Sequence, residues 1–264
     1  MVDHTIGVAT NDSVNEEVRR YWEKQPCGTS PDVVHALAPG SVPWFAAIER
    51  TRYALEPCVA QVARFSQWRD KELLEIGVGA GADHLGFARA GARTHGVDLT
   101  AAAITTTRAH LAVHGLTSDL RRCDAEALPF DDQSFDIVYS WGVIHHSDSP
   151  ARVVAEIHRV LRPGGLFLGM VYARYSLVAA KVWLRYALAT GRPFQSLSKV
   201  VADHMESQGT KSYTQQEVRD LFSAFTSCLT RKIATHWDTR HLPAQVRGVI
   251  PNAAGWFIVI EAVK

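Results

Sequence analysis

The sequence predicts an α/β domain built on a doubly wound sheet of mainly parallel strands. Short apolar segments alternate with segments of helical periodicity from Lys71 to Tyr172, and a glycine-rich turn follows the first of them. The 264 residues are 47% hydrophobic, which is enough to fill the core of such a domain. This alternation is typical of right-handed βαβ units, whose helices cover both faces of a Rossmann-like sheet.

The strands and helices follow one another in a regular order. Strands are expected at 72–76, 94–98, 119–123, 135–140, 166–172, 228–234 and 256–263, and the last two could pair as an antiparallel hairpin. Helices are expected at 13–24, 44–68, 82–90, 101–114 and 214–225. A further helix starts at Ser149-Pro150 and ends at Pro163-Gly164-Gly165. The first helix opens with a capping box, Ser13-x-x-Glu16.

The chain is expected to consist of two parts, the second of which contains an insertion. Residues 1–68 are expected to form an N-terminal helical cap, and 69–264 the main domain. Within the main domain, 176–213 is a helical insertion before the last two strands and is expected to act as a lid on the acceptor side.

Composition excludes several classes of protein. The formal charge is +1 and no long Lys/Arg tract occurs, so we expect no nucleic-acid partner. The most apolar helical stretch, 176–190, is short and contains Lys181 and Arg185, so we expect no membrane partner. No apolar leader is found near the N-terminus, and the four cysteines form no C-x-x-C pair. We therefore expect a cytoplasmic protein.

Two motifs indicate a cofactor that contains adenosine. Glycines in Glu75-Ile-Gly-Val-Gly-Ala-Gly81 let the backbone turn sharply and approach a ligand, although a tight turn without a ligand would look the same. Asp98 ends the next strand, where an acid accepts hydrogen bonds from both ribose hydroxyls or else caps the following helix. The pair does not separate cofactors, because Gly77-x-Gly79-x-x-Ala82 also satisfies the dinucleotide fingerprint.

Three further motifs narrow the choice. Cys123-Asp-Ala-Glu-Ala-Leu-Pro-Phe130 follows the third strand, Ser140-Trp-Gly-Val-Ile-His-His146 the fourth, and Leu161-Arg-Pro-Gly-Gly165 precedes the fifth. In this order the five motifs resemble class I S-adenosylmethionine-dependent methyltransferases of the small-molecule type, with a natural-product or quinone-like acceptor. The resemblance is strong over about Lys71–Tyr172 and looser beyond it.

The resemblance implies how the cofactor is held. The loop with Gly77, Gly79 and Gly81 would pass under its methionine part, and the other expected contacts come from the ends of the strands and the first helix. They are Tyr21 and Glu75, Asp98 to the ribose, Leu99 to the adenine, Asp124 and the Ala125 N–H to the adenine edge, and the backbone of Ser140 and Trp141 near the sulfonium. A structural role is expected for Glu126.

Histidines supply the candidate catalytic groups. His145 and His146 follow the fourth strand, and either could take a proton from an attacking hydroxyl, with a slight preference for His145. Alternatively one of them only orients the loop, since methyl transfer needs mainly alignment. His110 and His114 are four residues apart on a predicted helix, but they lie on its polar side without a third ligand, so no metal site is expected.

The sequence therefore predicts transfer of the methyl group of S-adenosylmethionine to an O, N or C atom of a small molecule. Aromatic residues with polar tips in the insertion, such as Tyr172 and Tyr213, favour an organic, partly apolar acceptor. Two alternatives remain open. One is an NAD(P)-dependent oxidoreductase, which lacks support from a Tyr-x-x-x-Lys pair, and the other is a non-catalytic S-adenosylmethionine-binding partner of another enzyme.

Overall fold

The computed structural model describes the chain except for residues 1–13, 208, 244 and 246–248. The first residues of the expected N-terminal cap, including Ser13 of the capping box, thus lie outside the described residues. None of the described helices is long and apolar enough to cross a membrane.

Within the described residues, seven strands form one sheet in the order β3-β2-β1-β4-β5-β7-β6. The strands are β1 (Glu72–Ile76), β2 (Arg93–Asp98), β3 (Asp119–Arg122), β4 (Phe135–Trp141), β5 (Leu161–Tyr172), β6 (Ser227–Ile233) and β7 (Phe257–Val263). The first five pair in parallel, and β7 is antiparallel to both β5 and β6. The predicted α/β class and terminal antiparallel hairpin are confirmed.

Strand β5 begins earlier than predicted. Leu161 already pairs with Phe135, and pairing resumes at Leu166 opposite Ile137, so the register shifts between these points. Gly164 has φ +75°, a conformation that glycine adopts without strain. The Pro-Gly-Gly turn expected after the helix is therefore an irregularity inside β5.

Helices follow the strands as the sequence predicts, with one exception. The predicted helix at 44–68 is divided into α3 (Val42–Leu55), α4 (Cys58–Ala63) and a 3₁₀ turn, η1 (Phe65–Trp68). Pro57 cannot continue a helix, and Arg64 has φ +50°, so the chain changes direction at both points. The remaining helices of the main domain and the cap are α1 (Val14–Lys24), α2 (Pro31–Val34), α5 (Ala82–Arg89), α6 (Ala101–Ala112), α7 (Pro150–Val160) and α10 (Gln215–Leu221).

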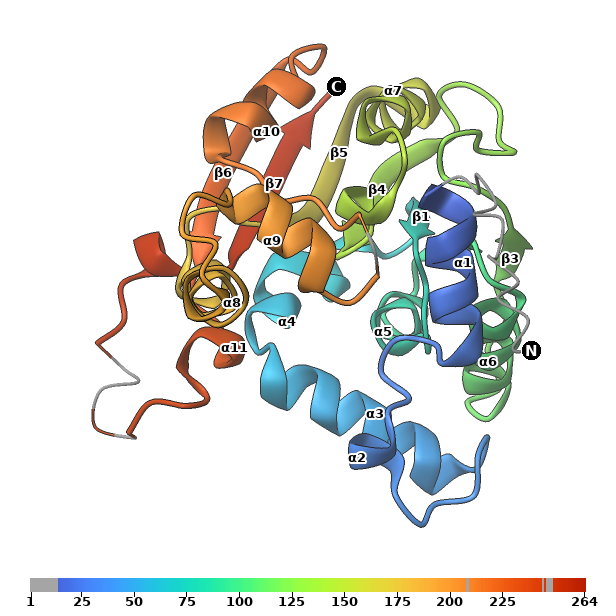
Figure 1. Cartoon of the computed structure of the whole chain (residues 1–264). Helices are drawn as coiled ribbons and strands as arrows, with labels where there is room; N and C mark the ends of the chain where they lie inside the picture. Colours follow the sequence, from blue (N-terminus) through green and yellow to red (C-terminus); the bar gives the residue numbers. More distant parts are fainter. Residues whose placement is uncertain (1–13, 208, 244, 246–248) are drawn as a thin grey trace, which may run out of the picture.

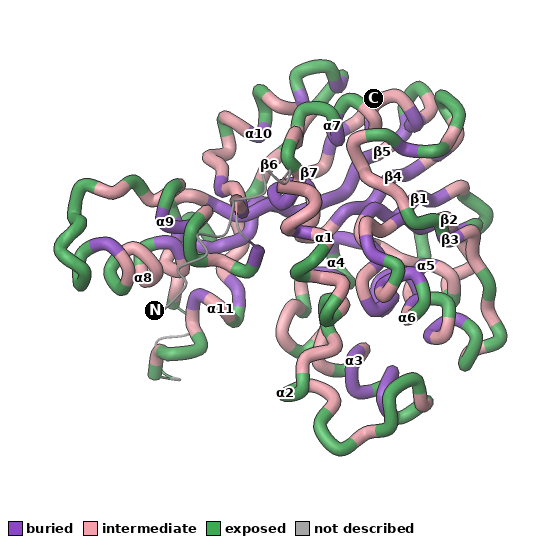
Figure 2. The backbone as a smooth tube through the Cα atoms, turned by 45° about the vertical axis from the view of Figure 1, so that its right-hand side comes forward, coloured by how far each residue is buried: buried purple, intermediate pink, exposed green. Residues whose placement is uncertain are grey.

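The segment between β5 and α10 carries the expected insertion. It contains α8 (Leu177–Tyr186), the 3₁₀ turn η3 (Leu188–Thr190) and α9 (Leu197–His204), and α8 packs against α9. Figure 2 shows that this helical pair projects from one side of the molecule, away from β1–β3. A short helix between β6 and β7, α11 (His236–Thr239), touches α8.

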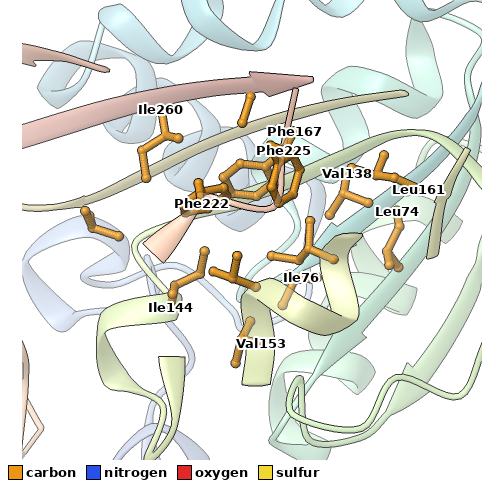
Figure 3. Packing of buried hydrophobic residues seen from close by; sticks show 14 of the residues in the cluster. Leu74, Ile76, Val138, Ile144, Val153, Leu161, Phe167, Phe222, Phe225 and Ile260 are labelled. Atoms are coloured by element: carbon orange, nitrogen blue, oxygen red, sulfur yellow. The ribbon is translucent and has the colours of Figure 1, made fainter. Parts of the chain in front are cut away.

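Both faces of the sheet are buried, which explains its continuous apolar strands. On one face Leu74 and Val138 pack with helices α7 and α10, and Phe167 stacks on Phe222, the residue after α10, with ring centroids 5.1 Å apart (Figure 3). On the other face the alternate residues Leu73 and Ile137 pack with α5 and η1. The period-two pattern thus assigns each strand residue to one of two cores.

The aromatic stack on β5 makes a direct test of this packing. Because Phe222 is fully buried, Phe222→Ala should lower the free energy of unfolding by about 3–5 kcal/mol. Urea denaturation followed by circular dichroism measures this loss. The matched control is Leu229→Ala on β6, where the side chain is 70% exposed, and its effect should stay below about 0.5 kcal/mol. Equal losses in both variants would contradict the assignment of the core.

Candidate functional site

A cavity of about 460 Å³ lies at the carboxyl ends of the central strands. Its walls come from the loops after β1, β2, β3 and β4, from α1 and α3, and from the end of the insertion. The strand order runs from β1 outward to β3 on one side and from β4 outward on the other, so the loops after β1 and β4 leave in opposite directions. Such a switch point is where doubly wound sheets bind ligands.

The loop after β1 is a close-fitting turn made possible by glycine. Gly77 has φ +83°, and a Cβ atom there would overlap the side chain of Val143. Gly81 has φ +80°, and its Cβ would lie 2.9 Å from Thr107 Cγ2. Thr107 also fixes the loop, because its hydroxyl donates to the Gly79 carbonyl at 3.0 Å. Gly77, Gly79 and Gly81 all line the cavity, and a glycine lets a ligand approach the backbone closely.

Asp98 is held at the end of β2 by three hydrogen bonds. One carboxylate oxygen accepts from the Gly79 N–H at 3.2 Å, and the other from the N–H and hydroxyl of Thr100 at 2.9 and 2.8 Å. Burial raises the pKa of this carboxyl, while the bonds from Thr100 and Gly79 act in the opposite direction. Both Asp98 and the following Leu99 line the cavity. The helix itself is capped by Thr100, whose hydroxyl accepts from Ala103 N–H.

Glu75 forms part of a buried hydrogen-bond chain that sequence reasoning missed. Its carboxyl lies 2.9 Å from Nδ1 of His84, and His84 Nε2 lies 2.8 Å from the hydroxyl of Ser118. That hydroxyl donates to the Thr94 carbonyl, so it accepts from His84 and leaves Nδ1 as an acceptor. Burial raises the pKa of Glu75 well above its usual range and lowers that of His84 to about 3. The chain therefore has a protonated Glu75 donating to a neutral His84.

Helix α1 is fixed across the cavity at both ends. Near its start, the Asn15 amide donates to Asp124 at 2.8 Å and to Glu126 at 2.9 Å. Near its end, the Glu23 carboxylate accepts from the first backbone N–H groups of α6 at 3.2 and 3.0 Å. Asp124 and Ala125 line the cavity, whereas Glu126 does not and instead joins α1 to the loop after β4. Asn15 was not predicted as a site residue.

Tyr21 and Trp22 occupy different positions on α1. Tyr21 is 46% exposed and is not among the residues that line the cavity. Trp22 lines the cavity and meets His146 edge to face, with centroids 6.0 Å apart. The cofactor contact expected from Tyr21 is thus not what the structure shows, because one residue along a helix rotates the side chain away from the wall.

The loop after β4 likewise separates neighbouring residues. The hydroxyl of Ser140 is buried and donates to the Ile76 carbonyl at 3.2 Å, which joins β4 to β1 below the cavity. Trp141 lines the cavity, and its indole N–H donates to Glu56 at 2.8 Å. Ser140 is not among the lining residues, and the backbone contact expected from it stays a prediction.

His145 is a buried packing residue. Its ring lies 3.9 Å from that of Tyr172 and 4.3 Å from that of His146, and it is not among the lining residues. Burial, followed by the nearby His146 and Lys211, holds the pKa of His145 well below its usual range. Because the ring does not line the cavity, it has no direct path to an acceptor there, and a catalytic role for His145 stays a prediction.

His146 faces the cavity and has one ring nitrogen fixed. Its Nδ1 lies 2.8 Å from the Ser207 hydroxyl and 3.1 Å from that of Thr210. The Thr210 hydroxyl donates to the Ser207 carbonyl, so it can only accept from His146, whereas the Ser207 hydroxyl can either donate to Nδ1 or accept from it. Nε2 makes no hydrogen bond with the described residues and lies 3.4 Å from the carboxylate of Glu206. The insertion supplies all three of these partners.

Aromatic side chains form the wall at the His146 end of the cavity. They come from α1, β4, β5, β7 and α11, and are Trp22, Trp141, Tyr172, Phe257 and Trp237. Tyr172 also donates to Glu206 at 3.1 Å. At the same end, Arg52 pairs with Asp83 at 2.6 Å and with Glu56 at 2.7 Å, which offsets one of their two negative charges. Glu206 and Arg52 were not predicted as site residues, since their place depends on distant segments.

The surroundings of His110 and His114 differ from the sequence prediction in two respects. His110 is fully buried, stacked on Phe45, and donates from Nδ1 to the Ala80 carbonyl. A third potential ligand is also present, because Glu49 of α3 lies 3.3 Å from His110 and 3.8 Å from His114. The guanidinium of Arg89 contacts both Glu49 and His114, so a side-chain cation already bridges this cluster.

Comparison with known proteins agrees with this geometry. Residues 74–169 match the family model described as a methyltransferase domain. The central part of this chain is a methyltransferase domain.

Relatives and solved structures extend the comparison. The chain is 35% identical over 181 residues to a phthiotriol/phenolphthiotriol dimycocerosates methyltransferase of Mycobacterium tuberculosis, covering 67% of this chain and 58% of that protein. It is 37% identical over 94 residues to a ubiquinone biosynthesis O-methyltransferase of Roseobacter denitrificans, covering 36% of this chain and 38% of that protein. The chain thus spans less than two thirds of these relatives. A geranyl diphosphate C-methyltransferase of Streptomyces coelicolor A3(2), solved with Mg²⁺, geranyl diphosphate and S-adenosyl-L-homocysteine, has the same fold, with a TM-score of 0.62, 16% identity and coverage of 97% and 99%.

The glycine-rich loop of the methyltransferase domain gives a test of its close packing. Gly77→Ala should lower the free energy of unfolding by about 2–4 kcal/mol, because it adds overlap with Val143 to the strain of a positive φ. Thermal or urea unfolding measures the change. Gly115→Ala is the matched control, since Gly115 has φ +68° with nothing within 4 Å, and should cost only about 1–2 kcal/mol. Equal costs would show that the loop has room for a side chain.

Proposed function

We propose that this chain is a cytoplasmic enzyme that transfers the methyl group of S-adenosylmethionine to a small organic acceptor. The observation that carries the proposal is one cavity with two different ends. The glycine loop and Asp98 line one end, and His146, whose Nε2 makes no hydrogen bond with the described residues, lines the other. The four cysteines are free in the structure, which fits a reducing compartment.

The residues at the β1–β3 end fit an adenosine-containing sulfonium. Gly77 and Gly81 let the loop pack closely on Val143 and Thr107, because a Cβ atom at either glycine would overlap those side chains. Asp98 would hold the ribose hydroxyls, while Leu99, Asp124 and Ala125 would hold the adenine. When bound, S-adenosylmethionine supplies an electrophilic methyl group. Glu75 lines the cavity, and it would face the methionine part of the cofactor from below the loop.

At the other end, His146 is the proposed general base. Its Nδ1 is held by hydroxyls of the insertion, and in the tautomer protonated at Nδ1 the Nε2 lone pair would accept a proton from a hydroxyl or amine of the acceptor. The Glu206 carboxylate, 3.4 Å from Nε2, would stabilise the imidazolium that results. Tyr172 stays protonated, because burial first and then Glu206 raise its pKa well above its usual range, and its hydroxyl orients Glu206.

The acceptor that suits this end is flat and largely apolar. Five aromatic side chains line it, and aromatic faces pack best against rings. Arg52 pairs with both Glu56 and Asp83 and offsets one of their two negative charges. We therefore favour an aromatic or natural-product-like molecule whose O, N or C nucleophile reaches His146. The M. tuberculosis and R. denitrificans relatives are likewise named as methyltransferases.

Turnover separates this proposal from its two alternatives. Purified protein is incubated with isotopically labelled S-adenosylmethionine and a panel of phenols, quinols and amines, and products are read by mass spectrometry. A labelled product one CH₂ heavier supports the proposal. Retained cofactor without turnover on any acceptor would favour a binding partner of another enzyme. Reduction of a nicotinamide cofactor without use of S-adenosylmethionine would favour an oxidoreductase.

Replacement of Asp98 tests the cofactor end. Hydrogen bonds to a charged group are typically worth roughly 1.5–3 kcal/mol, so Asp98→Ala should weaken S-adenosylhomocysteine binding about tenfold to a hundredfold. Asp98→Asn should weaken it less, because it keeps the shape of the loop. Calorimetry measures both, and Asp220→Ala on the exposed face of α10 is the control. Unchanged affinity in Asp98→Ala would mean that this acid only holds the Gly79 loop.

Replacement of the histidines tests the acceptor end. His146→Gln should lower turnover about a hundredfold to ten-thousandfold while leaving S-adenosylhomocysteine affinity nearly intact, since a general base contributes by that order. Higher pH should restore part of the loss for an acceptor with an ionisable hydroxyl. His145→Gln is the neighbouring control and should keep turnover within about tenfold. If His146→Gln also stays within that range, alignment suffices and the assigned role is wrong.

A further inference from the structure

Three large apolar side chains are exposed in the last turn of α8 and the segment that joins α8 to α9. Leu184 is 50% exposed and Leu188 48% exposed, while Phe194 is 100% exposed. A single exposed leucine is ordinary, but an unshielded phenylalanine next to two exposed leucines is not. Figure 2 shows this end of the α8–α9 pair as an exposed tip that projects from the molecule.

The backbone holds these side chains in a defined turn. Leu184 lies near the end of α8, Leu188 lies four residues further on in the 3₁₀ turn η3, and both side chains are exposed. The turn then folds back on α8, because Arg192 N–H donates to the Ala187 carbonyl at 2.8 Å. The indole of Trp183 donates to the carbonyl next to Phe194, that of Gln195, at 2.7 Å.

The charges near these side chains are mostly positive; the acid Asp203 also lies here, and its carboxylate accepts from the Gln195 side-chain amide next to Phe194 at 3.3 Å. From residue 176 to 202 the charged residues are Lys181, Arg185, Arg192 and Lys199, and the first acid is Asp203. Lys199 pairs with Asp203 at 2.9 Å, and Lys181 donates to a backbone carbonyl of α11. Arg185 and Arg192 are exposed and form no ion pair with an acid of the described part of the chain.

We propose that this surface, Leu184, Leu188 and Phe194 with Arg185 and Arg192, docks on an anionic lipid surface; we call it the interfacial patch. Leucine and phenylalanine insert at the headgroup boundary, and each arginine reaches lipid phosphates while its stem stays apolar. A second copy of the chain fits less well, because a two-fold contact through this patch would bring the arginines of both copies together.

The interfacial patch belongs to the same insertion that reaches the cavity. The insertion that carries the patch also supplies Glu206, Ser207 and Thr210 to the His146 end of the cavity. Docking would therefore place the acceptor side of the cavity near the bilayer, where apolar molecules accumulate. This last step rests on the proposed function, whereas docking itself does not.

The patch differs from what the sequence led us to expect. Residues 176–190 predict no membrane span, because this segment is too short and too charged to cross a bilayer. The same two properties are those of a segment that lies on the surface of a bilayer instead.

Vesicle sedimentation tests the patch with the full chain. We expect binding to phosphatidylcholine vesicles containing phosphatidylglycerol, little binding to pure phosphatidylcholine, and loss of most binding at high salt. The variants are Leu184→Ser/Leu188→Ser/Phe194→Ser and Arg185→Gln/Arg192→Gln, each expected to lower partitioning about tenfold or more. The matched control is Leu229→Ser/Arg231→Gln, at two exposed positions of β6, which should bind like the unchanged protein.

Every other result would overturn the proposal. Absence of binding to anionic vesicles, or binding that the apolar and arginine variants leave unchanged, would contradict it. So would a dimer in lipid-free solution that the apolar variant dissociates, since this would make a second copy the occupant. The variants should keep their S-adenosylhomocysteine affinity, so failure of docking is distinguishable from failure of the proposed cofactor site.

Discussion

The position of every site residue depends on the reversal of strand order between β1 and β4. Because the chain builds outward from β1 to β3 and then returns to the other side of β1, the loops after β1 and β4 diverge at the carboxyl edge of the sheet. The resulting crevice is lined by backbone at Gly77, by the acid Asp98 and by the loop that carries His146. Without that reversal, a helix would cover this edge and the same residues would face a packed core.

Two segments outside the sheet convert the open crevice into a cavity with unlike ends. Helix α1 is fixed to the loop after β3 through Asn15 and to the start of α6 through Glu23. The insertion reaches the opposite end, where Ser207 and Thr210 fix one nitrogen of His146. The β1–β3 end is therefore rich in acids and backbone groups, and the other end in aromatic rings. This difference suits a charged cofactor on one side and a flat apolar acceptor on the other.

The sequence was sufficient for those features that local pattern controls. Short apolar runs predicted the strands, and the glycine spacing predicted the sharp turn that contains Gly77 and Gly81. Features set by long-range packing were not predictable: the choice of His146 over His145 depends on Tyr172, and Glu206 enters from a segment sixty residues further along. The break in the helix at Pro57 has a local signal in the sequence, because proline cannot continue a helix. The link between His110 and Glu49 has none, since it joins two helices far apart in the chain.

The central claim is that the cavity accepts an adenosine-containing sulfonium and not a dinucleotide. Calorimetric titration of the purified chain with S-adenosylhomocysteine and, separately, with NAD tests it most directly, because neither ligand requires knowledge of the acceptor. The account predicts saturable binding of S-adenosylhomocysteine at one site per chain and little binding of NAD. NAD binding as tight as that of S-adenosylhomocysteine, or tighter, would contradict it.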